Sequence, residues 1–536
     1  MSLPEFIGQM EMFGLRKQSI LEEKDRYRLF FEKVYPVLVR ARGRLEKCYC
    51  VENGRPGVEP VVLLGVSLLQ FMERLPDRAA VEQLRYHVGW KYALNQELNT
   101  GVFDASVLVR FRERLLAHEE GRTVFEVVRE ALEEAGLVAA RGRQRLDSTQ
   151  VLGLVKRMSA LDCVRESLRL ALEELDVELA QRPGFWAAMW ERYVESRLDY
   201  RTGEAKLREK MKQAGEDAWA LLCWLENAGA GKGPQGQLLR RVFEERFRVE
   251  ESAVAVETDR ESGHVQNPHD PEAQYRIKGQ GKPGWVGYVI QVAETAGEGP
   301  VASGEPTGNY ITSVVTQPAT GSDEAGMTET LKEQAEMGMD KPGELYVDGA
   351  YVSGKELARA ARENRALLGP AVSSRAGKGC EFRVEDFSVD IEGRRAVCPA
   401  GQASTQCSRI EDRWNGIVEY RFEWSWRCGG CPERARCLGS KQGHRTIRVG
   451  PDHMFLQARR REMETAEFQE RMKRRSGIEG TLSELVRGHG ARRARYRGLA
   501  KVRLQNYFIG AACNVKRWLR RIAWQMQAMP GTLQPA

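Results

Sequence analysis

The sequence predicts a mixed α/β fold in which a sheet is flanked by helices and preceded by an all-α N-terminal domain. Two patterns lead to this prediction. Short β-prone runs, each closed by a turn, recur between stretches with helical periodicity. Before the first such run, the segment Val61–Gly136 shows helical periodicity alone.

Size and composition limit the class of protein. The chain has 536 residues, enough for two to four domains, and 42% of them are hydrophobic, enough for sizeable cores. No run of about 18 apolar residues indicates a membrane span. The most apolar early segment, Val61–Met72, begins too late and is too short for a signal peptide. We therefore expect a cytoplasmic protein without membrane contact.

The N-terminal domain is expected to be a series of helices. Its apolar spacing predicts a helix over Lys24–Arg42 that is kinked at Pro36. The further helices expected are Val61–Arg74, Arg78–Val88 after a cap at Asp77, Ser106–Ala117 after a cap at Asp104, and Thr123–Ala135. The arginine-rich helix, with Arg110, Arg112 and Arg114, fits a helix-turn-helix-like DNA module and an ordinary helical bundle equally well.

The α/β part begins with the strand-like run Arg145–Val155 and is then interrupted. Helical patterning from Lys156 to about Glu245 predicts an all-α insertion, whose tryptophans (Trp186, Trp190, Trp219 and Trp224) we expect in its core. The elements expected afterwards are the strands Val286–Ala293 and Ile311–Thr316, a helix over Ser322–Met337, a strand ending at Asp348, a helix over Lys355–Glu363 capped by Ser353, the short strand Leu367–Leu368, and, after a second insertion, a helix over Phe468–Arg487.

These patterns give a domain plan. We expect an all-α domain over 1–138, the first catalytic strand in 139–156, a helical insertion over 157–250, the rest of the catalytic core in 251–371, a Cys-rich zinc-binding insertion over 372–465, C-terminal catalytic helices with a basic tail over 466–525, and a flexible tail over 526–536.

Three carboxylates are candidate catalytic residues. Asp348 follows an apolar β-prone run and precedes a turn. This order places it at the C-terminal end of a strand, where open α/β sheets build their sites. Asp147 lies on the first strand, and Glu479 lies on a helix four residues after Arg475, the spacing of an ion pair. Three convergent carboxylates bind hard divalent cations such as Mg²⁺. A pair of such ions assists phosphoryl transfer.

Basic residues are concentrated near the C-terminal end of the chain. The net charge of the whole chain is only +7, yet the segment from Arg471 to Gln525 has 15 Lys and Arg residues against two acids, Glu479 and Glu484. So uneven a distribution indicates a polyanionic partner, and nucleic acid is the most plausible one.

The three acidic motifs and this basic segment resemble a known family. Arg145-Leu-Asp-Ser-Thr, Val347-Asp-Gly-Ala-Tyr351 and Arg475-x-x-x-Glu479, followed by Tyr496-Arg-Gly-Leu-Ala-Lys-Val-Arg503 and Asn514-Val-Lys516, are similar to the Asp-Asp-Glu (DDE) transposases of bacterial insertion sequences. The closest branch is the insertion-sequence eleven-eighty-two family. The resemblance covers the chain from about Val61 to Leu519.

The resemblance implies a fold, an activity and partners. It implies a ribonuclease-H-like catalytic domain with Asp147, Asp348 and Glu479 as ligands of Mg²⁺ or Mn²⁺. It implies cleavage at the terminal inverted repeats of the element, joining to target double-stranded DNA, and a homodimer or larger assembly in the cytoplasm, associated with the nucleoid. The residues expected to grip DNA phosphates are Arg475, Arg487, Arg497, Lys501, Arg503 and Lys516.

One position departs from the family pattern. Similar sequences often have a lysine seven residues after the glutamate, which returns it to nearly the same helix face. Here that position is Val486, and Arg487 follows about 80° off the face. Whether Arg487 takes over the DNA contact is therefore open.

A cysteine cluster predicts a second metal site. Six of the 11 cysteines fall within Cys380–Cys437, and Cys428-Gly-Gly-Cys431 has the spacing of a metal-binding knuckle. With Cys398 and Cys437 these thiolates satisfy tetrahedral Zn²⁺ in a structural site. Cys380, Cys407 and His444 are possible additional members, and the alternative is a set of reduced thiols.

Two other functions fit the same residues. One is a transposase-derived, zinc-containing DNA-binding protein without catalytic activity, against which the complete set of three acids argues. The other is a nuclease of the same fold that cuts without joining. Metal-dependent cleavage and joining assays distinguish the three functions.

Overall fold

The computed structural model describes residues 21–528 with the exception of 51–56, 180, 198–202, 252, 258–262, 280, 298–305, 307, 375, 377–378, 413–415 and 440–441. The first 20 residues of the expected N-terminal domain and residues 529–536 of the expected flexible tail lie outside the described part of the chain.

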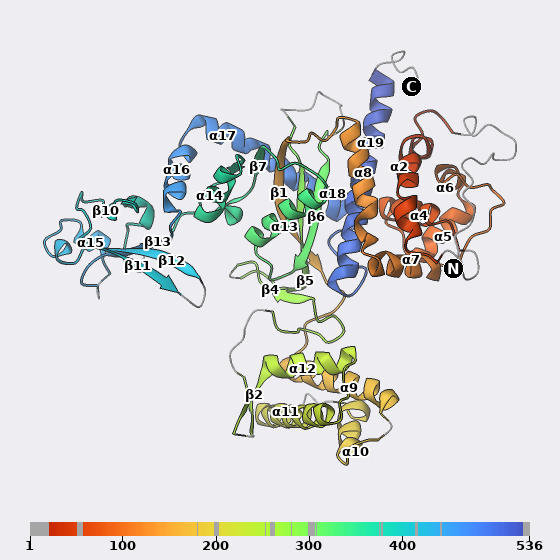
Figure 1. Ribbon diagram of the computed structural model, residues 1–536, viewed down its shortest axis with the longest axis horizontal. Coiled ribbons are helices and arrows are strands. Elements are labelled where there is room, and N and C mark those ends of the chain that lie inside the picture. Colours follow the sequence, from red (N-terminus) through yellow and green to blue (C-terminus); the bar gives the residue numbers. More distant parts are fainter. Residues whose placement is uncertain are drawn as a thin grey trace.

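A mixed sheet forms the centre of the molecule (Figure 1), and the predicted α/β class is confirmed. Its main strands follow the spatial order β6–β5–β1–β7–β8. The bounds are β1 Arg143–Leu152, β4 Gln274–Arg276, β5 Trp285–Thr295, β6 Ile311–Pro318, β7 Glu344–Tyr346 and β8 Ala366–Leu368. The strands β1, β5 and β6 pair antiparallel, whereas β7 and β8 continue the sheet from β1 in parallel. The short strand β4 pairs with the start of β5.

Helices cover both faces of this sheet, which explains why its central strands are buried along almost their whole length. Adjacent residues of a strand point to opposite faces. In β5, Val292 belongs to a large core that includes the C-terminal helix, whereas Ala293 packs with Leu331 of α13 (Asp323–Glu336) on the other face. The remaining elements near the strand ends are the 3₁₀ helix η5 (Gly349–Tyr351) and α14 (Gly354–Arg362), which starts after the predicted cap Ser353.

The part of the C-terminal basic segment from Leu499 onward lies in a core helix and not in a tail, so that part of the domain plan is wrong. Helix α19 (Leu499–Ala528) lies between the sheet and the N-terminal helices (Figure 1) and packs on β6, α4 and α8. Its middle, from Leu504 to Val515, is buried throughout. The helix also passes the boundary expected at 525. Within the described ranges, no helix is both long and apolar enough to cross a membrane.

The N-terminal domain is all-α, as predicted. Its elements are α1 Arg26–Leu29, the π-helix η2 Phe30–Val34, α2 Tyr35–Arg40, α3 Arg42–Glu46, α4 Pro60–Glu73, α5 Asp77–Tyr86, α6 Val88–Ala93, α7 Ser106–Ala117, the 3₁₀ helix η3 Glu120–Arg122 and α8 Thr123–Glu134. The expected distortion at Pro36 is a π-turn just before it, because proline cannot donate its backbone hydrogen bond. Asp77 is the first residue of α5 and does not cap it; Pro76 occupies the cap position.

The helical insertion has a core of its own and lies below the sheet in Figure 1. Its elements are α9 Ala160–Glu178, α10 Trp186–Trp190, the π-helix η4 Glu191–Glu195, α11 Glu204–Asn227, α12 Pro234–Arg246 and the hairpin of β2 Phe247–Glu250 with β3 Ala253–Val256. Because Val254 and Val265 belong to the same core, the insertion is not purely helical and extends past the boundary at 250. Of the four tryptophans, Trp186 is buried, whereas Trp219 is 37% exposed.

A small β-rich subdomain and a set of helices complete the chain. The subdomain comprises η6 Val384–Asp386, β9 Ser388–Asp390, β10 Arg395–Val397, β11 Gln406–Asp412, β12 Ile417–Glu423, η7 Trp426–Cys428, α15 Arg434–Cys437 and β13 Thr446–Val449. The helices that follow are α16 His453–Met463, α17 Ala466–Met472, η8 Lys473–Ser476 and α18 Gly477–His489. The single helix predicted over Phe468–Arg487 is therefore broken by a 3₁₀ turn before α18.

Candidate functional site

Asp147 lies in the middle of β1, opposite Val292 of β5. Its side chain is 18% exposed, and one carboxylate oxygen accepts a hydrogen bond from the Ser148 amide at 2.7 Å. Burial raises the pKa of this carboxyl, and the neighbouring carboxylate of Asp348 raises it further. The fold therefore brings two acids together at a cost in electrostatic free energy.

Asp348 stands just beyond the end of β7, as the sequence predicts. Its carboxylate accepts a hydrogen bond from the Ala350 amide at 2.7 Å and thereby caps η5. Because β1 and β7 are adjacent parallel strands, this position is close to Asp147 on the neighbouring strand.

Glu479 lies in the first turn of α18, and its side chain is 68% exposed. The Arg475 guanidinium connects it to the first strand: Nη2 is 3.6 Å from the Glu479 carboxylate and Nη1 is 3.7 Å from the Asp147 carboxylate. The i,i+4 pair expected from the sequence is thus present. The contact from Arg475 to Asp147, which no local spacing indicates, brings all three predicted acids to one region.

The donor set fits a hard divalent cation, since it consists of carboxylate oxygens. The raised pKa of Asp147 supports this fit, because a bound cation relieves the repulsion between Asp147 and Asp348. The three acids do not have the spacing of ligands to one ion. Among the described residues, they are not in a group of His, Cys, Asp or Glu side chains whose ligand atoms all lie within 4.8 Å of one another. The Arg475 guanidinium supplies a positive charge between Asp147 and Glu479.

Further polar residues at this site were missed by the sequence analysis. The Ser148 hydroxyl donates to Asp323 at 3.1 Å, and the buried Tyr351 hydroxyl donates to Gln291 at 2.6 Å. Burial raises the pKa of Tyr351, and the nearby carboxylates of Asp323, Asp147 and Asp348 raise it further, so its hydroxyl stays protonated. Tyr351 is part of the Asp-Gly-Ala-Tyr motif, and that adjacency was the one available signal.

Lys278 is another neighbour that sequence reasoning did not identify. It follows β4, and its ammonium is close enough to Asp147 to lower the pKa of that carboxyl, although burial outweighs this effect. The two are far apart in the chain, and only the pairing of β4 and β1 with β5 brings them together.

Two protein-family models match the chain. Residues 397–519 match a family described as "Transposase DDE domain", and residues 16–114 match one described as "Transposase domain (DUF772)". The two matches support a DDE transposase of insertion-sequence type. No curated protein and no solved structure matches it. The first match includes Glu479 and Arg475, whereas Asp147 and Asp348 lie outside both matched segments.

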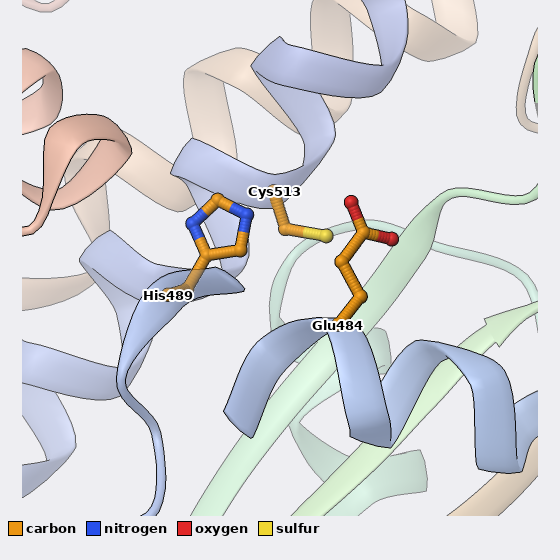
Figure 2. A group of neighbouring side chains, drawn as sticks. All are labelled: Glu484, His489 and Cys513. Carbon is orange, nitrogen blue, oxygen red and sulfur yellow. The ribbon is translucent and has the colours of Figure 1, made fainter. Parts of the chain in front are cut away.

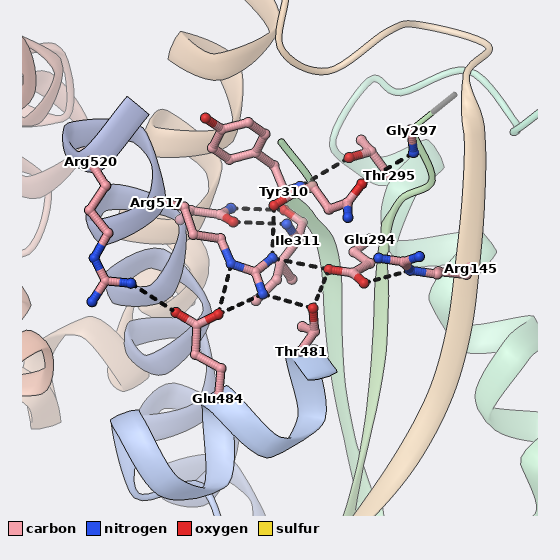
Figure 3. Close-up of polar contacts among 12 residues, drawn as sticks. Arg145, Glu294, Thr295, Gly297, Tyr310, Ile311, Thr481, Glu484, Arg517 and Arg520 are labelled. Carbon is pink, nitrogen blue, oxygen red and sulfur yellow. Dashed lines mark hydrogen bonds and ion pairs between the residues drawn. The ribbon is translucent and has the colours of Figure 1, made fainter. Parts of the chain in front are cut away.

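The transposase holds the helix of Glu479 in place with a buried ion-pair network (Figure 3). Glu294 of β5 is fully buried and pairs with Arg145 at 2.6 Å and with Arg517 of α19 at 3.0 Å. On α18, Thr481 donates to Glu294 at 2.6 Å, and Glu484 pairs with Arg517 at 2.8 Å. These bonds connect β1, β5, α18 and α19. The network residue nearest to Glu479 on α18 is Thr481, two residues further along the helix.

Gly477 has no side chain, and this leaves room for the Arg145 guanidinium. The Arg145 guanidinium crosses the start of α18 and donates to the Arg474 carbonyl at 2.9 Å. A Cβ atom at position 477 would lie 1.9 Å from the same guanidinium. Any larger residue at Gly477 therefore displaces either Arg145 or the helix that carries Glu479.

A tight Glu-His-Cys cluster elsewhere in the transposase is not a convincing metal site. Glu484, His489 and Cys513 offer ligand atoms within 4.8 Å of one another (Figure 2). The Glu484 carboxylate is already engaged by Arg517 at 2.8 Å and by Arg520 at 3.8 Å. Burial raises the pKa of the Cys513 thiol to about 12 and lowers that of His489 to about 4, so both are neutral. With these arginines alongside, the cluster has too little negative charge for a cation.

The predicted DNA-contacting residues are on the surface to differing degrees. The exposed ones are Arg487, Arg497, Lys501 and Arg503, whereas Arg475 is partly buried between the acids. Lys516 is half-buried on α19, and burial lowers its pKa. Within the arginine-rich helix α7, Arg110 is exposed, but Arg112 is buried in an ion pair with Asp77 at 2.5 Å, so Arg112 is not available to DNA.

The four cysteines predicted to bind zinc line one small cavity of about 20 Å³ in the β-rich subdomain: Cys398, Cys428, Cys431 and Cys437. That volume suits a single ion or water molecule. The pKa of the Cys437 thiol is raised to about 11, mainly by burial and to a lesser extent by Cys428, Cys398 and Cys380, and a bound cation would favour its thiolate form. Cys407 and His444 do not line the cavity, and His444 is 3.8 Å from Glu423.

Proposed function

We propose that this transposase binds the terminal inverted repeats of its element, cuts the DNA at their ends and joins them to target DNA, with Asp147, Asp348 and Glu479 as the catalytic residues. The observation that carries the proposal is the bridge from Arg475 to Asp147 at 3.7 Å and to Glu479 at 3.6 Å, beside Asp348.

The strand order supports a ribonuclease-H-like catalytic domain. Numbered without β4 and the insertion hairpin, the sheet has the order 3-2-1-4-5, with the first three strands antiparallel and the last two parallel. In this arrangement Asp147 on the central strand and Asp348 after its parallel neighbour meet from elements far apart in sequence. Membership of the insertion-sequence eleven-eighty-two branch is consistent with this arrangement and with the family matches.

The three carboxylates would hold Mg²⁺ or Mn²⁺. Such ions polarise an attacking water or 3′-hydroxyl and stabilise the leaving oxygen. Asp147 and Asp348 provide ligands from fixed backbone positions, and the buried network around Glu294 orients the helix of Glu479. Arg475 compensates the charge of the free acids and then turns to a DNA phosphate, together with Arg487, Arg497, Lys501, Arg503 and Lys516.

A cleavage assay tests the proposal. Labelled duplexes that carry either presumed end of the element are incubated with Mg²⁺, with Mn²⁺ or with EDTA, and the wild type is compared with Asp348→Ala. The matched control is Asp340→Ala, an exposed acid shortly before β7. We expect metal-dependent nicking and joining that Asp348→Ala abolishes while DNA binding persists. Binding without cleavage by the wild type, with both metals and both end sequences, would leave a non-catalytic DNA-binding protein.

Structural zinc at Cys398, Cys428, Cys431 and Cys437 is a separate part of the proposal. The supporting observation is their shared cavity. We expect about one zinc per chain, lost in Cys428→Ser and retained in Cys223→Ser, whose cysteine lies on α11 of the helical insertion. Metal analysis of the purified protein measures this content, and equal zinc in both variants would contradict the site.

A synaptic complex of two DNA ends requires at least two copies of the catalytic site, so we propose a homodimer or larger assembly on DNA. Light scattering of the protein with and without a DNA end tests it. A single copy bound to each end under conditions that allow joining would contradict it.

A further inference from the structure

A cavity of about 780 Å³ opens beside β4 and the ends of α9 and α12, where the helical insertion joins the sheet. Its walls come from the segment after β1, from the end of α12 and from the segment that returns to β4. The residues that line it are Arg157, Met158, Ser159, Ala160, Arg246, Gly263, His264, Gln266, Tyr275 and Ile277.

Hydrogen bonds between these segments fix the walls. The Met158 amide donates to the Gln266 carbonyl at 3.0 Å, and the Asn267 amide side chain donates to the Lys156 carbonyl at 3.0 Å. Arg246 donates to the Val265 carbonyl at 2.6 Å. One backbone hydrogen bond and two side-chain-to-backbone hydrogen bonds therefore hold the walls of the cavity together.

The wall combines a flat cation with apolar side chains. The Arg157 guanidinium lies over the Tyr275 ring, 4.3 Å from its centre. Met158 lines the cavity beside them, and Ile277 is 52% exposed despite its size. Aromatic and guanidinium planes together with apolar side chains form the surface on which unpaired nucleobases stack.

The charge of the cavity favours an anion. Arg157 and Arg246 face it, and the first turn of α9 adds the partial positive charge of a helix start. Two acids that are close in the chain to lining residues, Glu245 and Asp162, have partners of their own. Glu245 accepts from the Val265 amide at 2.7 Å and pairs with Arg241 at 2.8 Å, and Asp162 accepts from the Ser159 hydroxyl at 2.6 Å.

The cavity is connected to the catalytic acids through a short segment. Ile277 at its edge immediately precedes Lys278, and the Lys278 ammonium lies within electrostatic range of Asp147. A strand of DNA held at Asp147 and Asp348 would reach the cavity by following this segment.

We propose that the cavity receives one unpaired nucleotide of the DNA strand held at the catalytic acids, with its base against the Arg157–Tyr275 pair and its phosphate near Arg246. This inference rests on the proposed function, because it takes DNA to be the substrate. On this inference, the junction between the helical insertion and the sheet binds single-stranded DNA at the element end.

The test compares two probes with the full-length protein in EDTA, where no cleavage occurs. One probe is a short blunt duplex, and the other is the same duplex with a single-stranded overhang that carries 2-aminopurine. The wild type should bind the overhang probe more tightly and quench its fluorescence. Tyr275→Ala should weaken overhang binding by roughly 5- to 150-fold, the range for losing one base stack, and leave blunt-duplex binding unchanged.

Two further variants keep the test decisive. Ile277→Asp alters an exposed side chain, so it should fold normally and still lose the overhang preference by repelling the phosphate. Arg182→Ala removes a comparable guanidinium, 5.7 Å from the Trp186 ring at the other end of the insertion, and should change neither probe. Equal weakening of both probes in a folded Ile277→Asp protein, or an unchanged preference in that variant, would overturn the inference.

The outcome is independent of the cleavage assay. Cleavage by the wild type without an overhang preference would overturn the nucleotide cavity alone. An overhang preference that depends on Tyr275 in a protein that never cleaves would overturn the proposed catalytic function alone.

Discussion

Two clusters of carboxylates and arginines in this transposase both include residues of β1 and α18, and they differ in charge balance. In the buried cluster, Glu294 and Glu484 are matched by Arg145 and Arg517, and Glu294 is fully buried. In the candidate catalytic cluster, Arg475 contacts Asp147 at 3.7 Å and Glu479 at 3.6 Å, and Asp348 lies beside Asp147. The balanced cluster stabilises the fold, whereas the excess of negative charge in the other is what a metal ion requires.

The largest expected effect is on stability in the balanced cluster. Glu294→Ala leaves Arg145 and Arg517 without their shared buried partner and should destabilise the protein by about 3–5 kcal/mol. Urea unfolding at neutral pH measures this loss. A loss below about 1 kcal/mol would mean that this buried network stabilises the protein no more than ordinary surface ion pairs do.

Asp147→Asn should reduce cleavage and, without metal, increase the stability of the protein. Removing a charged catalytic ligand should reduce cleavage by about 100-fold or more. Because burial and Asp348 raise the pKa of Asp147 in the folded state, its ionisation destabilises the fold as pH rises through that pKa. The metal-free variant should therefore be more stable than the wild type at pH 7, with the difference vanishing below the unfolded pKa of about 3.9.

Thermal unfolding of both proteins across pH in EDTA measures this second effect. Added Mg²⁺ should stabilise the wild type more than Asp147→Asn. If the variant is less stable than the wild type at pH 7 without metal, then Asp147 is a structural residue and the contrast between the clusters fails.

Arg475→Gln should change DNA binding more than stability. Its two ion pairs are long and partly exposed, so we expect a stability loss below about 1 kcal/mol. If Arg475 contacts one DNA phosphate, the slope of log affinity against log salt concentration should fall by about 0.9. Binding titrations at several salt concentrations give the slope, with Arg517→Gln as the buried comparison, which should lower stability and leave the slope unchanged.

The smallest effect is expected at the edge of the balanced cluster. Arg520 is 63% exposed and lies 3.8 Å from Glu484, so Arg520→Gln should cost less than about 0.5 kcal/mol. Urea unfolding of Arg520→Gln and of Glu294→Ala compares the loss of an exposed partner with the loss of a buried partner in the same network. A cost near that of Glu294→Ala would mean that burial does not determine the value of these pairs.

Local signals in the sequence determined the α/β class and the order of its elements. Asp348 after a β-prone run, Ser353 as a helix cap and the four-residue spacing of Arg475 and Glu479 all depend on nearby residues, and the structure has each of them in the expected local setting. Turn chemistry and periodicity are local properties, so one sequence is enough to reveal them. The three acids remain a prediction as catalytic residues.

Only the tertiary structure decided which charges are free. The last part of the basic segment, which was expected to be a tail, is the core helix α19, and Arg517 and Arg112 are buried against acids from distant elements. Lys278 reaches Asp147 only because β4 and β1 both pair with β5. Whether an arginine is a surface cation or half of a buried ion pair depends on partners from other elements, 35 residues away for Arg112 and 223 for Arg517, and neither composition nor local spacing contains that information.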